Sequence, residues 1–185
     1  RCGEAVTGTQ DRGLEKQIVV PYGETTPVHL QEAIDASHTV QKGVVCRCPC
    51  GATASVTETT GCEWQDWAFI STPRCAMMQG VGKRVSRPLV LTNPLMLPMR
   101  GHTKEPYDLC AVAEHLGDIN GAAYAHYTVK VPFGQDWYEC DDARSEKVYG
   151  APQSSTNSYM VVYRRRGAEL EYTASPSNAS APEPQ

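Results

Sequence analysis

The sequence lacks three features that would assign it at once to a broad class of proteins. None of its apolar runs approaches the ~20 residues that a membrane-spanning helix needs. The net charge is −4 at pH 7, so no basic face for nucleic acid is expected. No signal peptide opens the chain, which begins at Arg1 without a methionine. We therefore expect no membrane and no nucleic-acid partner, and an intracellular protein of the cytoplasm or nucleus.

The cysteine usage fits reduced thiols better than a secreted, disulfide-linked fold. The eight cysteines and the glycosylation sequon at Asn178 would formally suit secretion. The sequon, however, lies in a tail of Ser, Pro, Ala and Glu that starts at Gly167 and has no apolar periodicity. Such a segment cannot bury enough surface to order itself, so we predict a disordered tail over 167–185. Residues 1–166 are long enough for one domain or part of one.

Three cysteines cluster at Cys46, Cys48 and Cys50, and Cys2 lies near the start of the chain. Closely spaced thiolates followed by glycine suit a turn that wraps a tetrahedral zinc ion. We predict a structural zinc held among Cys2, Cys46, Cys48 and Cys50, and the spacing leaves open which of them bind. The alternative is a degenerate segment without metal.

None of the eight cysteines precedes an amphipathic helix whose N-terminus would lower the pKa of a thiol, so none is predicted to be a nucleophile. Three of them lie in apolar, strand-like runs, where a small buried hydrophobe is the expected role: Cys75, Cys110 and Cys140.

A histidine and two aspartates fall within one predicted β-hairpin. Its strands cover 124–131 and 137–142, and the segment between them contains proline and glycine. A four-residue loop would place Asp141 opposite His126, whereas a five-residue loop would place Asp142 there. A histidine oriented by a carboxylate is a general base, and general bases activate nucleophiles. The pattern thus predicts two members of a catalytic triad.

The rest of the chain is predicted to be mostly strand. Thr26 and Pro27 resemble a helix N-cap and first helical residue, and an apolar stripe predicts a helix to about Ser37. Strands are expected over 14–20, 44–48, 52–59, 67–71, 74–79, 88–92 and 158–165. The segment 108–116 is ambiguous, because its apolar residues fit a helical stripe as well as a strand.

Several motifs, taken in order, resemble the C-terminal half of a ubiquitin-specific protease. They are the run from Tyr107 to Gly117, then Ala125-His126-Tyr127, Trp137-Tyr138, Asp141-Asp142, and Ser154 to Arg164. Weaker matches lie upstream, at 71–79, at Lys83-Arg84 and at 89–94. Five elements that match in both order and spacing are far more specific than a single motif.

This resemblance implies an α+β, papain-like cysteine protease fold with a mainly antiparallel sheet. It implies a fingers region over about 1–70, a palm with the histidine box over 71–166, and a strand rather than a helix at 108–116. It also implies that His126 is the base, that Asp141 orients it, and that a cysteine thiolate attacks the carbonyl after the last glycine of ubiquitin. The implied partners are ubiquitin or ubiquitinated proteins, and no cofactor is implied for catalysis.

The sequence also departs from the family pattern. Ala125 replaces a glycine, Cys140 replaces an aromatic residue, and Asn157-Ser158 stands where small apolar residues are common. The glycine- and asparagine-rich box that ends in the nucleophilic cysteine occurs nowhere in these residues. We expect that box upstream of Arg1 and expect the isolated chain to be inactive. The alternative is an inactive relative that binds ubiquitin or another protein without cleaving it.

Overall fold

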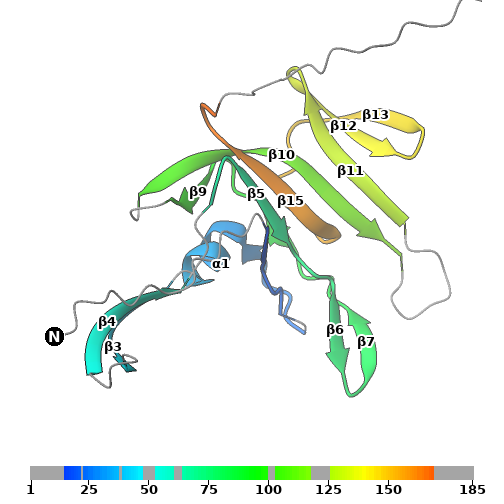
Figure 1. Cartoon of the computed structure of the whole chain (residues 1–185). Coiled ribbons are helices and arrows are strands. Elements are labelled where there is room, and N and C mark those ends of the chain that lie inside the picture. Colours follow the sequence, from blue (N-terminus) through cyan, green and yellow to red (C-terminus); the bar gives the residue numbers. More distant parts are fainter. Residues whose placement is uncertain are drawn as a thin grey trace, which may run out of the picture.

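One large sheet organises the molecule. The computed structural model describes residues 15–21, 23–37, 39–47, 53–60, 64–99, 103–117 and 126–168. Seven strands follow the order β1-β5-β15-β10-β11-β12-β13, and β9 pairs with the first part of β10 to complete the eight (Figure 1). Their bounds are β1 Glu15–Gln17, β5 Trp67–Ser71, β9 Leu95–Pro98, β10 Lys104–Leu116, β11 His126–Phe133, β12 Asp136–Asp141, β13 Arg144–Val148 and β15 Ser158–Arg165. Only the pairing of β1 with β5 is parallel in this sheet, so the predicted mainly antiparallel α+β architecture is confirmed.

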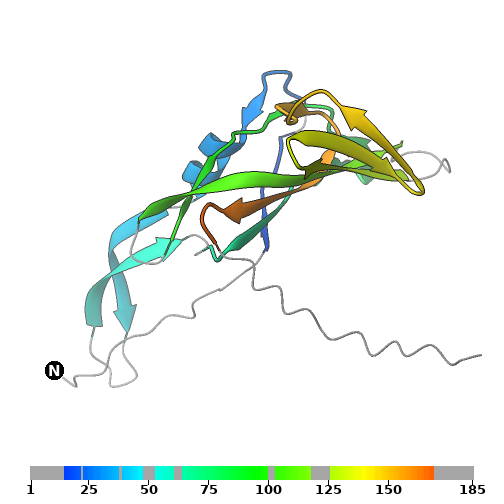
Figure 2. The ribbon, with the colours of Figure 1, turned by 90° about the horizontal axis from the view of Figure 1, so that it is seen from above.

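Three smaller sheets and one helix accompany the large sheet within the described residues. β2 (Val28–His29), β8 (Leu89–Val90) and β14 (Ser154–Ser155) form one, β3 (Thr39–Arg47) and β4 (Thr53–Thr60) the second, and β6 (Cys75–Met78) and β7 (Val81–Arg84) the third. Helix α1 (Leu30–Ser37) lies on one side of the large sheet (Figure 2). In the part of the chain that the structure describes, no helix is long and apolar enough to cross a membrane.

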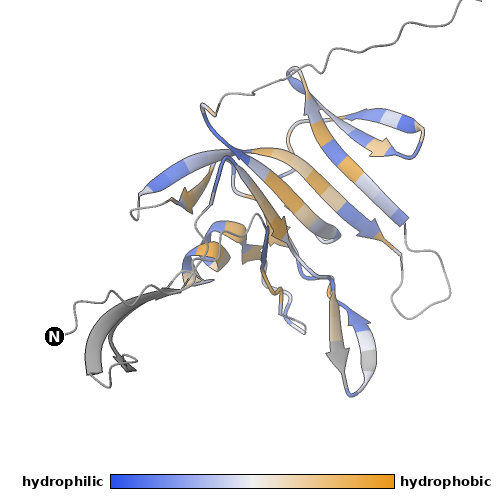
Figure 3. Ribbon diagram, in the orientation of Figure 1, coloured by the Kyte–Doolittle hydropathy of each residue, from blue (hydrophilic) through white to orange (hydrophobic). Residues whose placement is uncertain are grey.

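The core lies between α1 and one face of the sheet. Val112, Val161 and Ile70 are cross-strand partners on β10, β15 and β5, and all three are fully buried. Leu30 and Ile34 of α1 belong to the same cluster. Hydrophobic and hydrophilic residues alternate along the second part of β11, as expected for a strand whose two faces differ (Figure 3). Each fully buried aliphatic side chain of this kind stabilises the fold by about 1.5–3 kcal/mol.

The helix begins later than predicted. Thr26 does not cap it, and Pro27 is not its first residue, because the next two residues form β2 in parallel with β8. The Val28 amide donates to the Pro88 carbonyl at 2.9 Å, which holds the backbone extended there. The apolar stripe was predicted correctly, since Leu30 and Ile34 are buried.

The segment 108–116 is a strand, as the resemblance implies, and its helical periodicity has a structural cause. A bulge shifts the pairing with β15 between Leu109 and Ala111. Because the extra residue reverses the alternation of side chains, Leu109 and Val112 both reach the core although they are three positions apart. β5 and β15 have the predicted bounds, whereas β1 and β8 are shorter than predicted. The proposed division at about residue 70 stays a prediction, and so does disorder of the tail, of which residues 169–185 lie outside the described residues.

Candidate functional site

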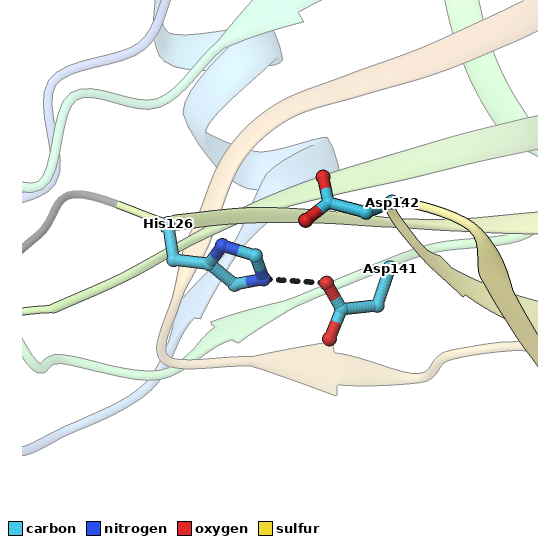
Figure 4. Close-up of side chains that lie close together, drawn as sticks. All are labelled: His126, Asp141 and Asp142. Carbon is cyan, nitrogen blue, oxygen red and sulfur yellow. Dashed lines mark hydrogen bonds and ion pairs between the residues drawn. The ribbon is translucent and has the colours of Figure 1, made fainter.

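The hairpin of β11 and β12 brings the predicted histidine and aspartate to the same end of the sheet. His126 is the first residue of β11, and Asp141 is the last residue of β12. Nε2 of His126 and Oδ1 of Asp141 are 2.6 Å apart (Figure 4). A carboxylate can only accept a hydrogen bond, so Nε2 is the protonated nitrogen in this pair. Figure 4 shows the other ring nitrogen, Nδ1, directed away from Asp141.

The predicted register of this hairpin was wrong, although the contact exists. Phe133 pairs with Asp136, so the loop has two residues, Gly134 and Gln135, instead of four or five. Gly134 has a φ of 63°, which permits the tight turn at its first central position. Continuing this register past its last pair sets Thr128, not His126, opposite Asp141. His126 therefore reaches Asp141 diagonally, across two residues on the same face of the sheet.

The second aspartate is close as well, but it belongs to the next turn. Asp142 follows β12 with a φ of 48°, a left-handed conformation that aspartate tolerates better than most residues. One ligand atom each from His126, Asp141 and Asp142 lie within 4.8 Å of one another. The hydrogen bond to His126 is made by Asp141, which is the assignment that the resemblance implies.

The pair is half exposed on one side and bordered by a buried hydroxyl on the other. The side chains of His126 and Asp141 are 41% and 46% exposed, so a reacting group can approach the imidazole. Thr128, two residues further along β11, is 4% exposed. Its Oγ1 is buried and has no hydrogen-bond partner among the described residues.

Aromatic rings lie on the opposite face of the same strands. His115 and Tyr127 are cross-strand partners whose ring centroids are 4.8 Å apart. The ring of Tyr127 meets that of Tyr159 edge-on, at 5.8 Å. Tyr127 is 52% exposed, so this cluster is partly open to solvent on the face opposite to His126.

Two departures from the family pattern are accommodated by arginines. Ser158 is fully buried, and its Oγ accepts a hydrogen bond from Nη2 of Arg74 at 2.6 Å. Oδ1 of Asn157 accepts one from Nη2 of Arg84, also at 2.6 Å. Burial and the neighbouring Arg84 lower the pKa of Arg74 to about 10, so its guanidinium stays charged at neutral pH. Both polar replacements, Asn157 and Ser158, therefore have arginine hydrogen-bond partners. Ala125 lies outside the described residues.

Of the predictions for the cysteines, the burial of three thiols is wrong and the zinc site is not tested. Cys75 is exposed, and Cys110 and Cys140 are half-buried, so the expectation of three buried thiols was wrong. Cys75 begins β6, in a two-stranded sheet apart from the core, which explains its exposure. Burial raises the pKa of the Cys110 thiol, which makes it a poor nucleophile. Of the predicted zinc ligands, Cys46 lies on β3, while Cys2, Cys48 and Cys50 fall outside the described residues, so the zinc site stays a prediction.

Sequence reasoning missed several charged residues near the pair. Glu114 and Lys130 form an ion pair on the face that carries His126, and at the opposite end of β10 exposed pairs join Arg165 to Asp66 and Arg166 to Asp108. The sequence does contain a signal for the Lys130–Glu114 pair. Lys130 lies an even number of residues from His126, so both side chains project from the same face of β11, which is an interior strand of the sheet. A lysine that faces inward there requires a counter-charge.

The comparisons with known proteins agree with this architecture. The family model described as ubiquitin carboxyl-terminal hydrolase matches residues 13–163. The chain belongs to the ubiquitin carboxyl-terminal hydrolase family. Among curated members, ubiquitin carboxyl-terminal hydrolase 43 of Mus musculus is 31% identical over 84 residues, 45% of this chain and 7% of that protein. Ubiquitin carboxyl-terminal hydrolase 9 of Arabidopsis thaliana is 32% identical over 65 residues, 35% of this chain and 7% of its own length.

Solved structures of deubiquitinating modules share the fold of this chain. The SAGA Ubp8/Sgf11/Sus1/Sgf73 deubiquitinating module bound to ubiquitin aldehyde matches with a TM-score of 0.58 at 14% identity, over 83% of this chain and 36% of that one. A form of the same module bound to monoubiquitin matches with a TM-score of 0.53 at 14% identity, over 84% and 35%. The chain thus spans about a third of the solved relatives and a small fraction of the curated ones.

Proposed function

We propose that this chain supplies the general base of a cysteine-type deubiquitinase. The observation that carries the proposal is the 2.6 Å contact between Nε2 of His126 and Oδ1 of Asp141. Family membership supports the reaction class, and the pair provides the chemistry that the class requires. Ubiquitin joined to a protein is the proposed substrate, because two of the solved relatives hold ubiquitin aldehyde or monoubiquitin.

In this proposal the two ring nitrogens of His126 have different roles. Nε2–H donates to Asp141, which fixes the tautomer and leaves the lone pair of Nδ1 free to accept a proton. A cysteine thiol facing Nδ1 would lose its proton to the imidazole, and the thiolate would attack the carbonyl after the last glycine of ubiquitin. The imidazolium then returns the proton to the leaving amine, and Asp141 stabilises its positive charge meanwhile.

The thiol itself is proposed to come from another part of the protein. Cys110 has a raised pKa, and neither Cys110 nor Cys140 is freely exposed. The matched segments cover only 7% of each curated relative, which leaves ample sequence for a cysteine box elsewhere. In this proposal the chain is one half of a catalytic centre.

The experiment measures hydrolysis of ubiquitin that carries a C-terminal fluorophore, using the intact protein. We expect His126→Ala to lower kcat/KM by about a thousandfold or more with folding retained. Asp141→Ala should cost less, because the imidazole stays but loses its orientation. His29→Ala is the matched control, since His29 is exposed on β2 in a separate sheet. Parental activity in the His126 variant would refute the proposed role, and an inactive parent that still binds ubiquitin would indicate a binding module instead.

A structural zinc at Cys46 and its neighbouring thiols is proposed separately. It is supported by the donor chemistry alone, because thiolates are preferred zinc ligands. Mass spectrometry of the native intact protein should find one bound zinc, and Cys46→Ser should lower its occupancy. Metal-free native protein would contradict the prediction without affecting the proposal for His126.

A further inference from the structure

The face of the sheet that carries His126 also carries a buried ion pair. Nζ of Lys130 on β11 lies 2.6 Å from Oε2 of Glu114 on β10 and 3.6 Å from Oε2 of Glu139 on β12. The exposed fractions of these side chains are 22% for Lys130, 9% for Glu114 and 35% for Glu139. One ammonium therefore joins three adjacent strands.

Both carboxylate oxygens of Glu114 are engaged. Oε2 accepts from Lys130, and Oε1 accepts from the hydroxyl of Ser155 on β14. The Ser155 hydroxyl oxygen in turn accepts hydrogen bonds from the backbone amides of Asn157 at 3.0 Å and Ser158 at 2.7 Å. The hydroxyl thus uses its one donor and both acceptor sites. A set this fully satisfied has one low-energy arrangement, which makes it a rigid support.

This cluster lies next to the proposed catalytic pair. Side chains alternate along a strand, so Lys130, Thr128 and His126 project from the same face of β11. Lys130 directly faces Glu139, and Asp141 follows two positions later on the same face of β12. The bridge between Lys130 and Glu139 therefore connects the same two strands as the contact between His126 and Asp141.

Backbone pairing does not hold those two residues to each other. His126 pairs with Leu116 of β10, and Asp141 pairs with Arg144 of β13, whereas the ladder between β11 and β12 ends at Val129 and Cys140. The backbone of His126 is thus held by β10 and the backbone of Asp141 by β13. Among the described residues, the Lys130–Glu139 bridge is the side-chain link between β11 and β12 that lies next to the His126–Asp141 contact on their common face.

Stability alone does not account for a buried ion pair at this position. Replacing such a pair by well-packed apolar residues is often neutral or stabilising, because two charges no longer have to be removed from water. What an ion pair adds is geometry, since its distance and direction fix one register of the strands that carry it.

We propose that Lys130 is a positioning residue that sets the distance between His126 and Asp141. Glu114 and Ser155 hold its ammonium in place, and Glu139 transmits that position to β12. The inference rests on the proposed function, because it concerns the efficiency of the same catalytic pair. A misplacement of a reacting group by about 1 Å costs up to a hundredfold in rate, so even a small change in this support is measurable.

The test compares kcat and KM of variants of the intact protein with the fluorogenic ubiquitin substrate. Glu139→Gln removes the charge from only the half-exposed link to β12 and weakens it, so we expect the melting temperature to stay unchanged while kcat falls several-fold at constant KM. Lys130→Met should lower kcat by about tenfold and also lower the melting temperature, because it leaves the buried Glu114 without its cation. Lys147→Met is the matched control, since its 2.7 Å bridge to Asp136 joins β12 and β13 at the far end of the strands.

The double variant Glu114→Met/Lys130→Met separates positioning from stability. It removes both charges, so the melting temperature should rise above that of Lys130→Met, although the buried Ser155 hydroxyl loses its acceptor. The inference predicts that kcat nevertheless stays low, whereas a purely structural pair would let stability and kcat recover together. Recovery of kcat in the double variant, or parental kcat in Glu139→Gln, would overturn the inference. His126→Ala is measured in parallel, because its retained activity would instead refute the proposed function.

Discussion

Replacing Arg74 by methionine removes a guanidinium that holds the connection between β14 and β15. Arg74 is 3% exposed and donates to the Ser158 carbonyl at 2.8 Å and hydroxyl at 2.6 Å, to the Ser155 carbonyl at 3.1 Å, and to the Arg87 carbonyl at 2.6 Å. Hydrogen bonds to charged groups contribute about 1.5–3 kcal/mol each, but the burial of the charge offsets part of their sum. Because the variant leaves buried acceptors unpaired, we expect a loss of about 3–5 kcal/mol.

Thermal unfolding of the intact protein measures this loss. For a folded unit of about 150–250 residues each kcal/mol lowers the melting temperature by about 2–4 °C, so Arg74→Met should melt on the order of 10 °C lower than the parent. Arg165→Met is the control, because it removes the same group from an exposed pair with Asp66 and should change the melting temperature far less. Equal melting temperatures for the two variants would show that the four hydrogen bonds do not stabilise the fold, and the reasoning would fail.

Gly134, Cys110 and Asp108 each give a further expected outcome. Gly134→Ala should lower the free energy of unfolding by about 1 kcal/mol, because its φ of 63° is unfavourable for a residue with a Cβ; Gln135→Ala, in the same loop, is the control. Thiol-specific labelling followed by mass spectrometry should modify exposed Cys75 faster than Cys110, whose pKa is raised by burial, and equal rates would contradict this. The hydrogen bond from Arg166 lowers the pKa of Asp108 below its ordinary 3.8, so the pair stabilises the fold above that pH and the contribution is lost as the pH falls through the lower, folded value. Asp108→Asn should therefore melt below the parent at pH 7 and together with it at strongly acidic pH, and a difference that does not change with pH would refute the assignment.

The contact between His126 and Asp141 was predictable because it depends on a short hairpin. Any loop of a few residues returns β12 alongside β11 and brings the aspartates near the histidine. The register was not predictable, because Pro132 suggested a loop yet remains in β11, opposite Trp137. The length of the turn is decided by the backbone of Gly134, which the sequence pattern does not specify.

Other features depend on contacts between distant segments and left little local signal. The bulge in β10 makes a strand appear helical, and only pairing with β15 reveals it. The start of α1 is set by β8, which lies some sixty positions along the chain. The counter-charge of Lys130 comes from Glu114 on another strand, so it becomes visible only when the register of both strands is known.

The most direct test of the central claim is the rate at which the intact protein is covalently captured by ubiquitin with a C-terminal electrophile, measured against pH. If His126 is the base that deprotonates the thiol, His126→Ala should react at least a hundredfold more slowly than the parent at neutral pH. The deficit should shrink as the pH rises toward the ordinary thiol pKa of about 8.5, because the thiol then ionises without help. A deficit that is absent, or that stays constant with pH, would contradict the role of His126 as the general base.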